Sequence, residues 1–136
     1  GRLRVREAQG GEELAAGAAW IAPGDFHMVV KRDGHRVVTA LHQEPPENSC
    51  RPAVDVLFRS VAEVYGGSVV SVILTGMGQD EYRGVELLKS QGAYVVAQDE
   101  KTSVVWGMPG YVAKEGLADA VVPLDQVAGS ILRQLG

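Results

Sequence analysis

The chain has 136 residues, with thirteen basic and seventeen acidic side chains, a net charge of −4 and 46% hydrophobic residues. This length suits one domain, and the composition is typical of an ordinary globular protein. The acidic balance argues against binding to nucleic acid or to an anionic membrane surface, and no apolar run is long enough to cross a bilayer. The single cysteine, Cys50, excludes an internal disulfide and is typical of a cytoplasmic protein.

The first forty residues predict β-structure. Residues 3–7 alternate apolar and charged side chains, as in a short strand, and residues 19–22 form a second apolar segment that ends at a Pro-Gly-Asp turn signature. Residues 26–31 and 36–41 are apolar runs on either side of Asp33-Gly34. Asp-Gly between two such runs is a strong hairpin signal, so we expect an antiparallel pair of strands here.

A helix and a buried strand are predicted after the proline-containing loop of residues 43–52. Apolar side chains recur at helical spacing from Val54 to Tyr65, and Gly66-Gly67 ends the helix. The period then changes. Residues 69–74 are a nearly unbroken β-branched run, which predicts a strand that is buried on both faces.

Short strands and helices alternate in the remaining residues. Strands are expected at residues 94–97 and 120–122, and helices at residues 111–113 and 127–135, with Asp125 as the N-cap of the last helix. This alternation predicts an α/β fold with a doubly wound, mostly parallel sheet, to which the antiparallel hairpin is added. Functional sites in such folds lie at the carboxyl ends of the strands.

The strand end at residues 74–80 carries the best candidate for chemistry. Gly76 and Gly78 allow a sharp turn, and backbone N–H groups there could face an oxyanion. Asp80 is placed to orient a histidine. The alternative is that Asp80 caps the helix expected to run to about Ser90. On local pattern alone, the cap is the favoured interpretation.

The polar segment at residues 97–103, after the next strand, has two interpretations. It is either a solvated loop held by Asx and Ser/Thr turns, or a wall of the same cleft as Asp80. The sequence pattern does not decide between them.

No metal or cofactor site is expected. The histidines His27, His35 and His42 are not spaced like metal ligands on one helix face. We predict that His35 is exposed and that His27 is a structural histidine with satisfied hydrogen bonds. Glu81 stands where the third glycine of a dinucleotide fingerprint would fall, and no Gly-x-Ser-x-Gly nucleophile turn occurs. Cys50 is interpreted as a bystander.

Four segments of the chain resemble, in order and spacing, the catalytic domain of CheB, the chemotaxis receptor methylesterase. They are residues 21–27 (IAPGDFH), 51–58 (RPAVDVLF), 73–80 (ILTGMGQD) and 97–109 (AQDEKTSVVWGMP). The resemblance covers nearly the whole chain. It therefore implies that residues 1–136 form part of one methylesterase catalytic domain, without a cofactor.

The resemblance implies an activity and residue roles. The activity is hydrolysis of glutamate methyl esters, and deamidation of glutamines, on methyl-accepting chemotaxis receptors in the cytoplasm. Asp80 matches the acid of a Ser-His-Asp triad, and Met77 matches a residue whose backbone N–H contributes to the oxyanion hole. The family's serine, histidine and first strands would lie upstream of residue 1, and a receiver domain could be present elsewhere in a longer chain.

Two departures from the family pattern support an alternative. The family usually has glycine after the aspartate, whereas this chain has Glu81-Tyr82, and Cys50 replaces the usual histidine before Arg51. The extra charge beside Asp80 could alter the loop or repel acidic receptor helices. The alternative is a catalytically degenerate homologue that binds a receptor or partner. Because the chain would lack strands of the family sheet, we also expect the 136-residue chain by itself to be inactive and to self-associate.

Overall fold

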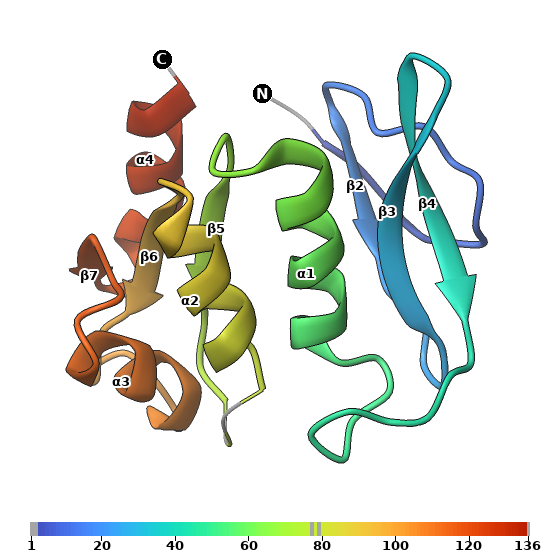
Figure 1. Cartoon of the computed structure of the whole chain (residues 1–136). Coiled ribbons are helices and arrows are strands. Elements are labelled where there is room, and N and C mark those ends of the chain that lie inside the picture. Colours follow the sequence, from blue (N-terminus) through green and yellow to red (C-terminus); the bar gives the residue numbers. More distant parts are fainter. Residues whose placement is uncertain (1–2, 77, 79, 136) are drawn as a thin grey trace.

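The computed structural model describes residues 3–76, 78 and 80–135, and its central helix lies between two regions of β-structure (Figure 1). In chain order the elements are β1 (Arg4–Glu7), β2 (Ala18–Ile21), β3 (His27–Asp33), β4 (Arg36–His42), α1 (Val54–Tyr65), β5 (Val70–Ile73), α2 (Tyr82–Ser90), β6 (Tyr94–Gln98), α3 (Gly107–Lys114), β7 (Ala120–Val122) and α4 (Leu124–Leu135). The α/β fold predicted from the sequence is confirmed.

The predicted hairpin is formed by β3 and β4, which pair antiparallel from His27–His42 to Asp33–Arg36. Gly34 in the connection has φ 64°, a left-handed conformation that glycine adopts without steric strain. Met28 and Val30 alternate along β3 and are buried. The Val30 N–H donates to Ser60 Oγ of α1 at 3.0 Å, which fixes the helix against the hairpin.

The two predicted N-terminal strands form a short parallel pair, with Arg4 opposite Ala18 and Glu7 opposite Ile21. Every residue of β1 is exposed, and Val5 of β1 and Ile21 of β2 are exposed large apolar side chains. This pair therefore leaves apolar surface in contact with solvent.

The second half of the chain contains the predicted parallel sheet, in the order β5-β6-β7. Val95, Val96, Ala97 and Gln98 of β6 are all buried. Alternate side chains of a strand point to opposite faces, so helices cover both faces of β6. Val95 packs on one face against buried valines of α2 and α3, and α4 also contacts β6. The doubly wound arrangement is thus confirmed.

The prediction that residues 69–74 are buried on both faces is wrong. In β5, Ser71 and Ile73 are buried, but Val72 is only half-buried and Leu74, just beyond the strand, is 42% exposed. The reason is position in the sheet: β5 is an edge strand, paired only with β6 in the described part of the chain.

Two helix boundaries also differ from the predictions. α3 begins at Gly107, so Pro109 lies inside its first turn, where proline is tolerated. α4 begins at Leu124, which places Asp125 in the first turn and not at the cap. The Leu124 N–H donates instead to Thr102 Oγ1 at 3.1 Å, an acceptor from a distant loop.

Candidate functional site

Asp80 lies between the end of β5 and the start of α2, and its side chain is 9% exposed. Its carboxylate binds the N-terminus of α1. Oδ2 accepts the Val54 N–H at 2.6 Å, and Oδ1 accepts the Asp55 N–H at 3.2 Å. The expectation that Asp80 caps α2 is therefore wrong, because it caps a helix more than twenty residues earlier in the chain.

The first N–H groups of α1 need acceptors from outside the helix. The preceding residue is Ala53, whose side chain has no acceptor. The Ala53 N–H donates to His27 Nδ1 at 3.3 Å, and Asp80 accepts from the next two residues. A carboxylate is favourable here because the N-terminus of a helix carries partial positive charge. Two remote side chains thus complete the start of α1.

Asn48 connects Asp80 to a second buried carboxylate, Asp55. Asn48 Nδ2 donates to Asp80 Oδ1 at 2.8 Å and to Asp55 Oδ2 at 2.9 Å. Asp55 is 2% exposed, and its Oδ1 accepts the Gly84 N–H of α2 at 2.6 Å. This network holds the Asn48 loop, α1, α2 and the Asp80 loop together.

The helices approach closely at Gly84, where the absence of a side chain matters. A Cβ atom built at Gly84 would lie 2.6 Å from Phe58 Cβ and 3.0 Å from Asp55 Oδ1. Only glycine therefore allows the Gly84 N–H to reach the Asp55 carboxylate without displacing α1.

Counting donors from the described residues alone, the Asp80 carboxylate has room for one further hydrogen bond. An ionised carboxylate offers about four acceptor positions, and three donors occupy it here. Oδ1 takes two of them and Oδ2 takes one, so the remaining position is on Oδ2. The three donors fix the orientation of the carboxylate. The carboxylate can therefore hold one additional N–H group in a defined position.

The carboxyl ends of β5 and β6 are joined by hydrogen bonds. The Thr75 N–H donates to Gln98 Oε1 at 2.8 Å, and the Gly76 N–H donates to the Val105 carbonyl at 2.9 Å. Residues 97–105 therefore lie beside the segment that leads to Asp80. Met77, the predicted oxyanion-hole residue, lies outside the described residues.

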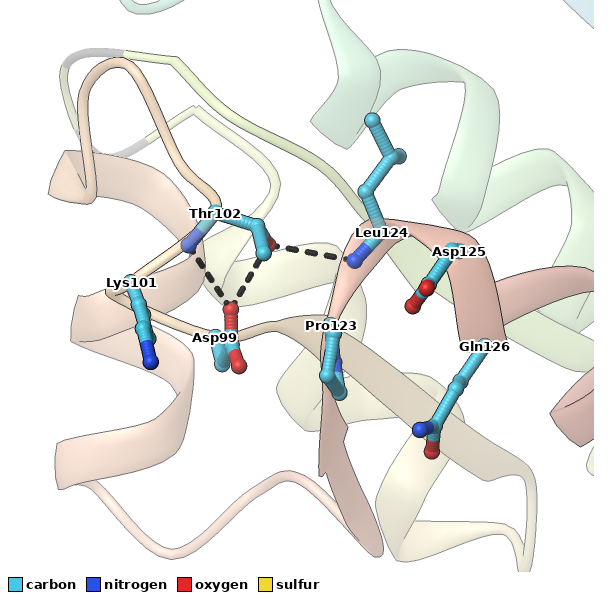
Figure 2. Close-up of a pocket in the computed structure, with 7 residues that line it drawn as sticks. All are labelled: Asp99, Lys101, Thr102, Pro123, Leu124, Asp125 and Gln126. Atoms are coloured by element: carbon cyan, nitrogen blue, oxygen red, sulfur yellow. Dashed lines mark hydrogen bonds between the residues drawn. The ribbon is translucent and has the colours of Figure 1, made fainter.

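The loop after β6 also borders a surface hollow with the start of α4 (Figure 2). Several polar groups around this hollow form hydrogen bonds with one another. Thr102 donates to Asp99 Oδ1 through its N–H at 3.0 Å and its hydroxyl at 2.6 Å, and the Leu124 N–H donates to Thr102 Oγ1. These are the Asx and Ser/Thr turns of the first interpretation. Asp80 is not among the residues that line this hollow.

His27 is the structural histidine that was expected. It is 1% exposed, its Nε2 lies 3.0 Å from the Pro45 carbonyl, and its Nδ1 accepts from Ala53. These contacts indicate that Nε2 carries the proton. His35 is exposed, as predicted.

A search of the described residues found no group of three His, Cys, Asp or Glu side chains that could hold a metal ion. Within the same residues, no helix is long and apolar enough to cross a membrane.

Sequence reasoning missed Asn48, Asp55 and the capping role of His27. Asn48 stood in a polar loop, and Asp55 in an amphipathic helix, where an acidic residue is ordinarily exposed. A weak signal was available for Asp55, because helical spacing places it on the same side as Phe58 and Ala62.

Replacing Asn48 with alanine should lower the free energy of unfolding by about 2–3 kcal/mol, because two buried carboxylates lose a shared donor. Urea denaturation followed by circular dichroism measures this change. Gln43→Ala is a matched control, since the Gln43 amide makes only long, exposed hydrogen bonds to Asp25. That variant should differ from the native chain by less than about 0.5 kcal/mol. Equal effects of the two substitutions would contradict the bridging role of Asn48.

Comparison with known proteins agrees with this arrangement of strands and helices. The model of the CheB methylesterase family matches residues 1–131. A protein-glutamate methylesterase/protein-glutamine glutaminase of Trichodesmium erythraeum is 50% identical over 135 residues, which are 99% of this chain and 38% of the relative. A similarly named protein of Rhodospirillum rubrum is 51% identical over 127 residues, which are 93% of this chain and 33% of the relative.

Among solved structures, the crystal structure of the Thermotoga maritima CheB methylesterase catalytic domain matches with a TM-score of 0.93 and 41% identity. The match covers 96% of this chain and 69% of that chain. The chain thus spans less than two-fifths of the length of these curated relatives and about two-thirds of the solved domain.

Proposed function

The chain belongs to the CheB methylesterase family, and from this premise we propose that it forms part of an enzyme that hydrolyses glutamate methyl esters and deamidates glutamines on chemoreceptors. Asp80 is the acid of its Ser-His-Asp triad. The single observation that carries this role is the Asp80 carboxylate, which three donors hold in place while none of the described residues occupies the last acceptor position on Oδ2.

In the proposed reaction a serine oxygen attacks the ester carbonyl, and a histidine takes the serine proton. Asp80 accepts the Nδ1–H of that histidine and stabilises the imidazolium that forms. The histidine then gives its proton to the departing methanol, and water releases the glutamate carboxylate from the acyl-enzyme. A glutamine substrate would release ammonia in place of methanol. The serine and the histidine lie upstream of this chain in the proposal.

Met77 is proposed to donate its backbone N–H to the oxyanion of the tetrahedral intermediate. The glycines on either side of it support this role, because they let the backbone turn sharply. Gly78 has φ 93°, a conformation that side chains disfavour. Methyl-accepting receptors as substrates, a cytoplasmic location and a receiver domain in a longer chain belong to the same proposal.

A degenerate binding homologue is the second candidate, and Glu81 favours it. Glu81 places a buried carboxyl group directly beside Asp80. Once this carboxyl group is ionised, its negative charge next to the triad acid would disturb the charge balance that the histidine requires. In this case the chain would bind receptors without hydrolysing their esters.

A chimera separates the two candidates. The chain is joined to the part of the Trichodesmium erythraeum relative that precedes the matching residues, and methanol release from methylated receptor is measured. We expect turnover within about tenfold of the intact relative, since the two sequences share half of their residues, and no turnover from the 136-residue chain alone. A chimera that folds and binds receptor but releases no methanol would overturn the esterase proposal and support the binding homologue.

Light scattering on the same two samples tests self-association. The exposed apolar side chains of Val5, Ile21 and Leu74 support larger species for the chain alone than for the chimera. A monodisperse monomer of the chain alone at high concentration would contradict this expectation.

A further inference from the structure

Glu81 combines an unfavourable side-chain environment with an unfavourable backbone conformation. Its side chain is 1% exposed, and neither carboxyl oxygen has a hydrogen-bond partner among the described residues. Its φ is 78°, in the left-handed region that residues other than Gly, Asn and Asp rarely adopt. Burial of an unpaired carboxyl group and a disfavoured backbone conformation are both unfavourable, so the surrounding fold must hold Glu81 in place.

The surroundings of Glu81 favour the neutral form of its carboxyl group. Burial is the main cause that raises the pKa of Glu81 from 4.5 to about 8, and the negative charges of Asp80 and Asp55 add to it. The nearby backbone N–H of Tyr82 lowers the pKa of Glu81, but this is the weakest of the effects, because its geometry does not make a hydrogen bond to either carboxyl oxygen. Glu81 also borders an apolar hollow whose other described lining residues, from α1, β5, the segment after it and α3, carry no ionisable side chain.

The two acidic neighbours are the residues that organise the candidate site. Asp80 is joined to Glu81 by a peptide bond, and Asp55 is the carboxylate that receives the Gly84 N–H. The Asp80 carboxylate itself is held by the N–H groups of Val54 and Asp55, so its position depends on the backbone that it shares with Glu81.

We propose that Glu81 is a positioning residue for Asp80. While its carboxyl group is neutral, the side chain stays inside the fold and Asp80 remains at the start of α1, whereas loss of the proton expels the side chain and releases Asp80. The driving force is the removal of an unpaired carboxylate from an apolar site between two other carboxylates. No further group is needed, because the proton leaves to solvent and the backbone at residue 81 can relax to negative φ.

Amide hydrogen exchange of the 136-residue chain tests this role without any catalytic assay. Between pH 6 and pH 9 the protection factors of the Val54 and Asp55 amides should fall at least about tenfold, because local opening of these hydrogen bonds follows the ionisation of Glu81. The Val95 amide is an internal control, since it donates to the carboxylate of Asp119 at 2.7 Å in another part of the fold. Its protection factor should stay constant.

Three variants complete the experiment. Glu81→Gln keeps the shape of the side chain and removes its charge. Glu81→Gly removes the side chain and adopts positive φ without strain. Both variants should retain the protection of the Val54 and Asp55 amides at pH 9. Glu86→Gln, an exposed position on α2, should behave as the native chain does. If glutamine prevents folding, the glycine variant decides. The same loss of protection in the glycine variant as in the native chain, or no loss in the native chain, would overturn the role of Glu81.

The catalytic consequence rests on the proposed function. In the chimeric esterase, Glu81→Gly should move the alkaline decline of kcat/KM to higher pH and leave its value near pH 6.5 within about threefold. An inactive chimera with a normal amide titration would count against the esterase and leave the positioning role standing. An active chimera whose alkaline limit does not move, together with flat amide protection, would overturn the positioning role alone.

Discussion

Asp80→Asn in the chimeric esterase should lower kcat for methyl-ester hydrolysis by about 10³–10⁴-fold, the range expected when a triad loses its acid. An asparagine at this position can accept through one oxygen only, and it cannot stabilise an imidazolium by charge. The histidine would then favour the wrong tautomer. Because binding of the receptor does not depend on that tautomer, we expect KM to change much less than kcat.

The structural role of Asp80 must be separated from its catalytic role in this experiment. The substitution removes an anion from the N-terminus of α1 and leaves one donor without an acceptor, which should lower the free energy of unfolding by about 1–3 kcal/mol. Activity is therefore compared at a temperature where both proteins are folded by circular dichroism. Asp125→Asn, at an exposed position in the first turn of α4, is the control and should keep full activity. Unchanged turnover in a folded Asp80→Asn protein would remove Asp80 from the triad.

The second large effect concerns stability and pH. The pKa of Glu81 is about 8 in the folded chain, against 4.5 for the unfolded reference. Between these values the folded chain holds a proton that the unfolded chain has released, so stability falls as pH rises. The favourable contribution is complete below pH 4.5 and is lost as the pH passes through about 8.

The magnitude follows from the size of the pKa difference. One pKa unit corresponds to about 1.4 kcal/mol. A rise from 4.5 to about 8 sets an upper bound of about 5 kcal/mol for the stability lost at alkaline pH. Expulsion of the ionised side chain into solvent reduces that loss, so we expect about 2–4 kcal/mol.

Urea denaturation of the native chain and of Glu81→Gln at pH 5 and pH 8.5 measures this loss. The two proteins should differ little at pH 5, whereas the glutamine variant should be the more stable at pH 8.5. Glu86→Gln provides the control for removal of an exposed charge from α2 and should follow the native curve. Parallel pH profiles for the native chain and Glu81→Gln would show that the folded chain does not hold the Glu81 proton.

The sequence predicted those elements whose stability depends on nearby residues. The hairpin of β3 and β4 follows from Asp33-Gly34 between two apolar runs, and α1 follows from the spacing of apolar side chains between Val54 and Tyr65. A strand was expected at residues 94–97, and β6 runs over Tyr94–Gln98. For these segments, local backbone preference and the apolar pattern favour the same structure.

Predictions failed where a distant partner decides the outcome. The capping pattern placed Asp80 on α2, but the residue before α1 lacks an acceptor side chain and Asp80 supplies one. β5 has the composition of a central strand, yet it is an edge strand in the described chain, so Val72 is only half-buried. A short window of sequence reveals neither which distant side chain caps a helix nor the order of the strands in the sheet.

The candidate site was predicted in part. Asp80 was named from the sequence as a candidate triad acid, and that role stays a prediction. Its partners Asn48 and Asp55 come from a loop and a helix that precede it by more than twenty residues. Glu81 was recognised only as a departure from the family pattern. Its burial became apparent from the packing of residues of α1, β5 and α3 around it.

The attachment of Asp80 to α1 has a consequence for how this family would diverge. A descendant that no longer needed to hydrolyse esters would still need an anion at the start of α1, so selection for a foldable chain alone would retain Asp80. The serine has no comparable structural role in the proposed scheme, so it could be replaced by other residues. An aspartate at this position in a distant homologue would therefore be a poor marker of retained catalysis.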